Sequence, residues 1–455
     1  MEKTTLRDIP SVNRVLLEIK EDSKIHESFL KKIIQDEIEI YRKKIKDGLI
    51  EKTSSALLEE IKYKVTNRAS TNLVNVINGT GIVLHTGFGR APFNSKSLKN
   101  IAKKMEGYVN LEFNLYNGKR GDRQEHVREI LSSICGSESS LVINNNAAAV
   151  MLAINDIAKG GEVIVSRGEL VEIGGSFRIP DIIHASGAIL KEIGTTNRTH
   201  SIDYINAINK NTKLILSVHT SNYVVKGFTK SVKLSELVSL GKKYSIPIMV
   251  DWGSGSLLKN ISKDTILDIP INQLMKDQPD VITFSGDKLI GGPQSGIVVG
   301  RENIINNLQK NTLYRTFRPD KLTIGLLEET LRSYRSTSFS KDNFSLNMLK
   351  TSRAILKKRG EKLIKIIKKS TIKDLNISLV PSLVEAGSGS LPEKNIKSMA
   401  LMFNPKIIGC SMLAKKLRLG EIPVVGFIRK NRFYIDLKAI LPNQLIQLAQ
   451  AINSV

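Results

Sequence analysis

Residues 284–300 read "FSGDKLIGGPQSGIVVG" and place one lysine, Lys288, between two glycine-rich turns. A β-like apolar run precedes these turns and another follows them. In an open α/β sheet, ligands bind beyond the carboxyl ends of the strands. The glycines at 286, 291 and 292 would let the backbone turn tightly and approach such a ligand closely. The stretch therefore predicts a strand, a ligand-binding turn that carries Lys288, and a second strand.

Seven short apolar runs between residues 140 and 300 indicate an α/β fold. Their apolar residues are continuous rather than alternating, which is typical of strands buried on both faces. Helical segments separate the runs, and this order favours a mostly parallel sheet covered on both sides. The runs are "SLVIN" (140–144), "EVIVS" (162–166), "AILKEIG" (188–194), "KLILSVHT" (213–220), "IPIMVDWG" (246–253), "VITFSG" (281–286) and "SGIVVG" (295–300).

The two ends of the chain carry different patterns. Near the start, Ser11 can cap a helix, and apolar residues then recur at a period near 3.6 at Leu30, Ile34, Ile38, Tyr41 and Ile45. Late in the chain, helical segments alternate with β-like runs, and "RKNR" (429–432) is typical of a hairpin turn. We predict a helical domain at 1–70, a large catalytic α/β domain at 71–330 and a small α+β domain at 331–455.

The net charge of +24, from 68 Lys and Arg against 44 Asp and Glu, suits a polyanionic partner such as nucleic acid. It also fits the lysine-rich composition that AT-rich genomes encode. The charge is uneven: residues 1–70 hold fifteen basic and thirteen acidic residues, whereas 341–373 hold eleven and two. The spacing of Leu349, Leu356, Leu363 and Ile367 predicts one amphipathic helix over 341–373. Its lysine-rich face fits a solvated surface and an RNA contact equally.

Several classes of protein and site are not indicated. No apolar run approaches the roughly 20 residues of a membrane span, and residues 1–10 lack the apolar core of a signal peptide, which favours a cytoplasmic protein. Cys135 and Cys410 are far apart and form no CxxC, so we expect buried free thiols. No HExxH or phosphate-loop motif occurs, no metal site is predicted, and "GTGIVLHTGFGR" (79–90) lacks the third glycine of a dinucleotide fingerprint.

Two further features stand at predicted strand ends, as Lys288 does. Asp251 ends one strand, where a buried carboxylate needs a cationic or hydrogen-bonding partner such as a pyridinium nitrogen. "NNNAAAV" (144–150) opens a helix whose first N–H groups can hold a phosphate. Singly, these features also fit a surface lysine, a capping aspartate and a capped helix. Their order is that of a fold-type I pyridoxal phosphate enzyme, an aspartate aminotransferase-like fold. The candidate cofactor-binding residues are Lys288, Asp251, Asn145, Asn146, Ala147 and Ser285.

At these residues the sequence resembles the bacterial selenocysteine synthases, the L-seryl-tRNA(Sec) selenium transferases. The resemblance runs over nearly the whole chain, and the family's usual residues are replaced at Trp252, Thr316, Phe317 and Pro319. The matching stretches include "NGTGIVLHTGFGRAP" (78–92), "NLEFNLYNGKRGDR" (110–123), "VINNNAAAVML" (142–152), "RGELVEIGGSFRIPDI" (167–182), "DWGSGSL" (251–257), "SGDKLIGGPQSGIV" (285–298) and "YRTFRPDKLT" (314–323).

The resemblance implies a reaction and an assembly. Seryl-tRNA(Sec) would become selenocysteinyl-tRNA(Sec) through an aminoacrylyl intermediate, with pyridoxal phosphate on Lys288 and selenophosphate as donor. Lys288 would be the catalytic proton carrier and Asp287 a second candidate. The N-terminal domain would recognise the tRNA, and dimers would assemble into a homodecamer. The alternatives are a pyridoxal phosphate lyase or aminotransferase acting on a free amino acid, and a tRNA-binding protein without catalysis.

Three arginines are candidates for the selenophosphate site. Arg90 follows the glycines of "HTGFGR" (85–90), and Arg315 and Arg318 are three apart in "YRTFR" (314–318). A helical turn would place the last two guanidiniums on one side, and planar guanidinium forks suit a tetrahedral anion. The same arginines also fit surface ion pairs or contacts with tRNA phosphates.

Overall fold

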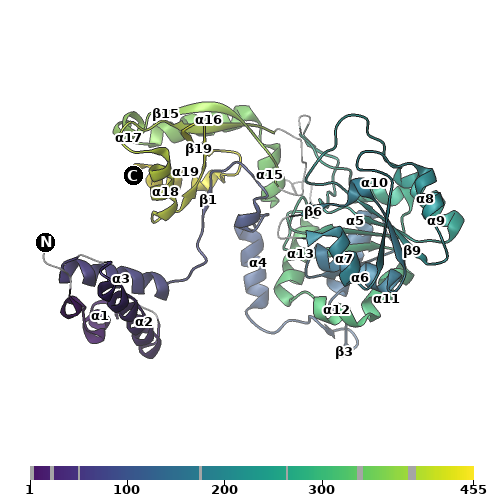
Figure 1. The fold of residues 1–455 in the computed structure, drawn as a ribbon, viewed down its shortest axis with the longest axis horizontal. Coiled ribbons are helices and arrows are strands. Elements are labelled where there is room, and N and C mark those ends of the chain that lie inside the picture. Colours follow the sequence, from purple (N-terminus) through teal and green to yellow (C-terminus); the bar gives the residue numbers. More distant parts are fainter. Residues whose placement is uncertain are drawn as a thin grey trace. The chain divides into compact units, whose positions relative to one another are not determined.

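The computed structural model describes residues 5–20, 25–49, 52–173, 177–262, 265–335, 342–387 and 396–455. Contacts within the chain divide it into two compact units, Met1–Asn75 and Val76–Val455. Figure 1 shows the elements of both units along the chain. The further division predicted at residue 330 stays a prediction. No helix among the described residues is long and apolar enough to cross a membrane.

The first unit is helical, as its periodicity predicts. Ser11 Oγ accepts a hydrogen bond from the Arg14 N–H at 3.2 Å and so caps the first helix. The five apolar residues of the predicted stripe are all buried in one cluster with residues of the other two helices. The helices are α1 (Val12–Ile19), α2 (Glu27–Lys46) and α3 (Ser54–Ala69), after a short 3-10 turn at Leu6–Asp8.

The seven predicted apolar runs form one seven-stranded sheet. Its strands lie in the order β4-β14-β13-β10-β9-β5-β8. The five strands from β13 to β8 are parallel, and β14 is antiparallel to both of its neighbours. The α/β class with a mostly parallel sheet is therefore confirmed. The strands are β4 (Ser139–Ile143), β5 (Glu162–Ser166), β8 (Ile189–Ile193), β9 (Thr212–Val218), β10 (Ile248–Asp251), β13 (Val281–Ser285) and β14 (Gly296–Gly300).

Helices cover both faces of this sheet (Figure 1). Side chains alternate across a strand, so Leu141 and Ile143 of β4 pack on one face while Val142 packs on the other. One face carries α6 (Asn146–Ala158), α7 (Ile179–Ala185), α11 (Glu302–Lys310) and α12 (Thr312–Phe317). The other carries α5 (Glu125–Cys135), α8 (Ser201–Ala207), α9 (Leu234–Tyr244), α10 (Ile271–Leu274) and α13 (Lys321–Ser333).

The last part of the chain is α+β. Its four-stranded antiparallel sheet has the order β15-β16-β19-β18. Residues Lys430 and Asn431, with φ of 48° and 57°, form the predicted tight turn between paired Arg429 and Arg432. The elements are β15 (Ile377–Val384), β16 (Ile396–Phe403), α18 (Cys410–Leu419), β17 (Val424–Val425), β18 (Phe427–Arg429), β19 (Arg432–Asp436) and α19 (Leu445–Asn453).

The single helix predicted over 341–373 is wrong, although its four apolar residues are buried. Residue 341 lies outside the described residues. Thr351 is extended, and Ser352 Oγ accepts from the Ile355 N–H at 3.4 Å and begins a new helix. From Phe344 on, the described residues form α15 (Phe344–Lys350), α16 (Arg353–Ile366) and α17 (Lys369–Asp374) in place of one helix.

Shorter elements complete the second unit. Cys135 is buried, as expected, whereas Cys410 is only partly buried because it lies at the first position of α18. The remaining elements are α4 (Ser95–Met105), β1 (Ile77–Asn78), β2 (Phe113–Asn114), β3 (Lys119–Arg120), β6 (Glu172–Ile173), β7 (Phe177–Arg178), β11 (Asn260–Ser262) and β12 (Thr265–Ile266). Of these, β1 pairs in parallel with β17, and β2 and β3 form a hairpin.

Candidate cofactor and substrate site

Lys288 lies in the turn that follows β13, and only 4% of its surface is exposed. The turn needs its glycines: Gly291 has a φ of +75°, and a Cβ at Gly286 would lie 2.9 Å from the Pro293 carbonyl oxygen. The pKa of Lys288 is lowered to about 8, chiefly by burial and also by the nearby charge of Arg90, while the charges of Asp251 and Asp287 act in the opposite direction. A buried amine with this pKa is partly neutral near neutral pH and can act as a nucleophile.

Asp251 is the last residue of β10, the strand next to β13, and is 3% exposed. Its Oδ1 accepts hydrogen bonds from Asn146 Nδ2 at 2.9 Å and from Thr283 Oγ1 at 3.3 Å. Desolvation raises the pKa of this carboxyl group, while the two hydrogen bonds and the charge of Lys288 oppose that rise. The surroundings thus leave a buried acid whose charged form would gain from a bound cation.

The candidate cofactor residues converge around Gly253, just beyond β10. A Cβ at this position would lie 3.5 Å from Lys288 Nζ and 3.9 Å from Asn146 Nδ2. The same Asn146 amide holds Asp251. A side chain at residue 253 would therefore touch the amine, so the Lys288 and Asn146 side chains both reach this point of the backbone. These residues fit pyridoxal phosphate. Its aldehyde requires an amine, and its ring nitrogen requires a buried carboxylate as partner.

The N-terminus of α6 supplies the candidate phosphate-binding groups. Asn145 caps the helix, because its Oδ1 accepts from the Ala148 N–H at 2.9 Å. Asn146 and Ala147 are the first residues of the helix, and the first N–H groups of a helix lack partners within it. Ser285, the last residue of β13, is 7% exposed. Sequence reasoning placed all four at strand or helix ends, and the structure keeps them there.

Arg90 and Asp287 form an ion pair beside Lys288. Arg90 Nε lies 3.4 Å from Asp287 Oδ2, and both side chains are mostly buried. The path of the chain here is unusual, as its glycines predict: Gly89 has a φ of +77° and Arg90 itself a φ of +61°. Such left-handed backbone is rare for a side-chain-bearing residue and is common at functional sites. Arg90 Nη1 is buried and has no hydrogen-bond partner within the described part of the chain.

Comparison with known proteins shows the family of the chain. A family model described as L-seryl-tRNA selenium transferase matches residues 76–441. The chain belongs to this family. The L-seryl-tRNA(Sec) selenium transferase of Aquifex aeolicus is 41% identical over 444 residues, covering 97% of both chains. The enzyme of the same name from Geobacter metallireducens is 43% identical over 402 residues, covering 88% of this chain and 87% of that one.

Solved structures show the fold. The structure of D-glucosaminate-6-phosphate ammonia-lyase superposes with a TM-score of 0.59 at 18% identity, covering 84% of this chain and 95% of that chain. At this identity the likeness concerns the fold alone. Together with the family match, it confirms the predicted fold-type I pyridoxal phosphate class.

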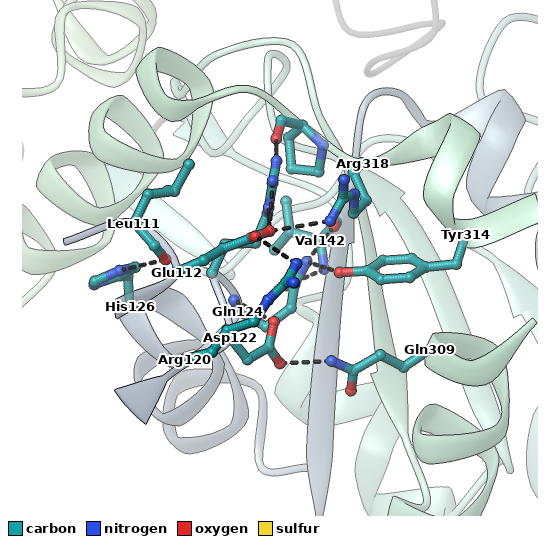
Figure 2. A network of polar contacts seen from close by, with 12 residues as sticks. Leu111, Glu112, Arg120, Asp122, Gln124, His126, Val142, Gln309, Tyr314 and Arg318 are labelled. Carbon is teal, nitrogen blue, oxygen red and sulfur yellow. Dashed lines mark hydrogen bonds and ion pairs between the residues drawn. The ribbon is translucent and has the colours of Figure 1, made fainter. Parts of the chain in front are cut away.

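In this chain, Arg318 lies in a polar network centred on Glu112 (Figure 2). Arg318 Nη1 is 3.0 Å from Glu112 Oε1. The expected helical turn linking Arg315 and Arg318 is wrong, because α12 ends at Phe317 and Arg318 is extended. Pro319 explains this, since a residue before proline is disfavoured in helical conformation. Arg315 is exposed on α12.

Sequence reasoning missed His219, which directly follows β9. Its ring stacks on Trp252, with centroids 3.9 Å apart and planes inclined by 19°. His219 Nδ1 is 3.5 Å from Asp268 Oδ2, too poorly placed for a hydrogen bond, and that oxygen accepts from Ser254 Oγ at 2.7 Å. Burial lowers the pKa of His219, and the charge of Lys288 adds to that effect while Asp268 opposes it. The sequence did carry a signal for His219. It follows β9 directly, and the neighbouring strand β10 ends at the candidate residue Asp251.

Proposed function

We propose that this member of the family converts L-seryl-tRNA(Sec) to L-selenocysteinyl-tRNA(Sec) with selenophosphate as the selenium donor and pyridoxal phosphate on Lys288. The relatives that match nearly its whole length carry the name of this activity. The observation that carries the residue assignment is the convergence of a buried lysine, Asn146 and a buried aspartate around Gly253.

The cofactor would be held by groups at three strand ends. Lys288 Nζ would form the covalent bond to the cofactor's aldehyde. Asp251 would face the ring nitrogen of the cofactor, and the first N–H groups of α6 would bind its phosphate. When bound, pyridoxal phosphate supplies an electron sink that stabilises negative charge at the Cα of the attached amino acid. Asp251 supports this because a buried carboxylate favours a protonated ring nitrogen. Asn146 keeps that carboxylate oriented through its 2.9 Å hydrogen bond.

Proton transfer falls to Lys288 and Asp287. Lys288 Nζ, partly neutral because its pKa is about 8, would take the proton from Cα of the seryl group. Asp287 is the next residue along the chain and is oriented by Arg90. The protonated Lys288 would then give its proton to the leaving β-hydroxyl group, and Asp287 is the second candidate for proton carrier. Selenium of selenophosphate would add at Cβ and Cα would regain a proton, while water cleaves the Se–P bond and phosphate leaves.

Arginines would bind the selenophosphate anion. Arg90 Nη1 and Arg318 Nε are both buried without hydrogen-bond partners within the described residues. A buried guanidinium N–H without a partner is costly, and a tetrahedral anion would satisfy it. Arg315, exposed on α12, is the third candidate. The unpartnered N–H groups support Arg90 and Arg318 as donor-binding residues, whereas Arg315 is proposed from the sequence alone.

The tRNA is proposed to be recognised by the N-terminal helical unit. Its basic residues mostly pair with carboxylates, as Lys62 does with Glu18 at 2.7 Å. Recognition would therefore rest on shape and specific contacts as well as on phosphate attraction. Deleting residues 1–75 is expected to weaken tRNA(Sec) binding and to leave cofactor loading intact. Retained affinity would point instead to the lysine-rich α16 and α17.

Assembly and location complete the proposal. We infer a cytoplasmic homodecamer built from dimers, since the resemblance implies this assembly and the substrate is an aminoacyl-tRNA. The first alternative, a lyase or aminotransferase on a free amino acid, has only the fold likeness to D-glucosaminate-6-phosphate ammonia-lyase behind it. The second, binding without catalysis, leaves the buried Lys288 without a role.

Selenium transfer by the purified, cofactor-loaded protein tests the proposal. With seryl-tRNA(Sec) and radiolabelled selenophosphate, we expect labelled selenocysteinyl-tRNA. Replacing Arg315 or Arg318 by alanine should leave tRNA binding and serine dehydration nearly intact and slow selenium addition at least about tenfold, equivalent to about 1.4 kcal/mol. Variants that lost tRNA affinity with a smaller salt slope, yet added selenium normally at saturating tRNA, would show that these arginines bind RNA instead.

A further inference from the structure

Glu112 is the shared acceptor of several guanidinium groups. Its Oε1 accepts from Arg123 Nε at 2.9 Å, from Arg123 Nη2 at 2.6 Å and from Arg318 Nη1 at 3.0 Å. Arg120 Nη2 lies 3.3 Å from the other oxygen, Oε2. Figure 2 shows the carboxylate at the centre of these contacts, with Arg318 directed toward it. One carboxylate thus faces three cationic side chains, and the cluster keeps an excess of positive charge.

The backbone on both sides of Arg318 is fixed. The Phe317 carbonyl accepts from the Asn144 N–H at 2.9 Å, which ties this segment to the loop before α6. The Pro319 carbonyl accepts from Arg123 Nη1. Glu112 is itself held at the base of the β2–β3 hairpin, because its carbonyl accepts from the Gly121 N–H at 3.0 Å. The remaining freedom of Arg318 is in its side-chain torsions, and the bond to Glu112 limits these.

The two edges of the Arg318 guanidinium are used differently. Glu112 contacts Nη1, whereas Nε, on the opposite edge with Nη2, is buried and has no hydrogen-bond partner among the described residues. The Nε–Nη2 edge is one that binds oxyanions through two parallel bonds. Glu112 therefore anchors the guanidinium without covering this edge. Hydrogen bonding to Arg123 lowers the pKa of Glu112, so the anchor stays ionised at neutral pH.

We propose that Glu112, anchored by Arg123, is a positioning residue that presents the Nε–Nη2 edge of Arg318 to the tetrahedral anion donor. This inference rests on the proposed function, since it takes Arg318 as a donor-binding residue. Glu112 acts only through Arg318 and does not touch the reacting atoms. Holding the long Arg318 side chain in one rotamer lowers the entropic cost of binding the anion. Loss of Glu112 should therefore weaken donor binding more than it slows turnover.

The test compares full-length, cofactor-loaded Glu112→Gln and Glu112→Asp with the wild type. At saturating seryl-tRNA(Sec), Glu112→Gln should raise the KM for selenophosphate about tenfold and change kcat by less than about twofold. The Kd of inorganic phosphate, measured by calorimetry as a donor-independent probe, should rise by a similar factor. Glu112→Asp, which keeps the charge, should recover part of both. Glu328→Gln is the matched control, because Glu328 pairs with Arg332 at 2.7 Å on α13 and should change neither constant.

Arg318→Ala separates this proposal from the assignment on which it rests. If Glu112 works through Arg318, Glu112→Gln should have no further effect on the selenophosphate KM in an Arg318→Ala background. An unchanged KM in Arg318→Ala alone would reject the donor assignment itself. A raised KM in Arg318→Ala with additive effects in the double variant would overturn only the role of Glu112. Tighter phosphate binding in Glu112→Gln would also overturn it, because Glu112 would then compete with the anion.

Discussion

Lys288 and Lys438 are two buried lysines that look alike by charge and burial. They are 4% and 1% exposed, and burial lowers the pKa of each to about 8. Each has a buried aspartate nearby, Asp251 or Asp436, whose pKa burial raises. Both pairs therefore show the signature often taken to mark a functional site.

Their surroundings separate them. Lys438 Nζ donates to the Thr351 carbonyl at 2.8 Å, and Asp436 accepts from the hydroxyl groups of Ser382 and Ser398. The Lys438 bond joins the C-terminal sheet to the junction of α15 and α16, and the Asp436 bonds link three strands of that sheet. Lys288 instead lies in a glycine-rich turn beyond the end of β13, beside Gly253 and Asn146. A shifted pKa thus reports burial, and the position of the group at the carboxyl ends of the parallel strands indicates chemistry.

The largest expected difference between the two lysines is in turnover. Lys288→Ala should lower selenium transfer at least about 1000-fold, or about 4 kcal/mol, because the nucleophile and proton carrier are lost. Lys438→Met should stay within about twofold of the wild-type rate but unfold more easily by about 1–3 kcal/mol, since the Thr351 carbonyl loses its donor. Kinetics and thermal unfolding of both variants check this. Comparable losses of turnover in the two would remove the distinction.

The two aspartates sharpen the comparison. Asp251→Asn should lower turnover about 100-fold while cofactor still attaches, because a neutral amide cannot favour a protonated ring nitrogen. Asp436→Asn should keep turnover and lose stability. Absorbance titration with pyridoxal phosphate and steady-state rates measure both effects. Wild-type turnover in Asp251→Asn would show that Asp251 is a structural residue like Asp436.

A smaller effect concerns the pH dependence of cofactor loading. The neutral amine reacts, and a pKa lowered from 10.5 to about 8 means that it is present above about pH 8. The loading rate of the apoprotein should rise about tenfold from pH 7 to 9 and then level off, whereas an unshifted lysine would give about 100-fold over the same range with no plateau. Stopped-flow absorbance measures this. A rate that kept rising beyond pH 10 would show that Lys288 is not desolvated.

Sequence patterns predicted what local physics determines. The seven apolar runs became the seven strands because buried parallel strands need continuous apolar residues. Lys288, Asp251 and Asn145 stand at element ends that the same patterns locate. The single helix over 341–373 failed because a capping serine at 352 starts a new helix within an otherwise helical pattern.

Contacts between residues far apart in the chain could not be predicted from such local patterns. Glu112 and Arg318 are 206 residues apart and meet only because the chain folds, so no local spacing pointed to their pairing. The stacking of His219 on Trp252 joins two strand ends and was missed for the same reason. The extended conformation of Arg318 was readable, since Pro319 follows it.

Borohydride reduction of the loaded protein followed by peptide mapping tests the central claim most directly. Reduction fixes the pyridoxyl group on the lysine that carried it, so the result does not depend on tRNA or selenium. We predict one modified peptide, with the label on Lys288 in the turn after β13. Label on Lys438, or on any other lysine, would contradict the assignment of the cofactor site.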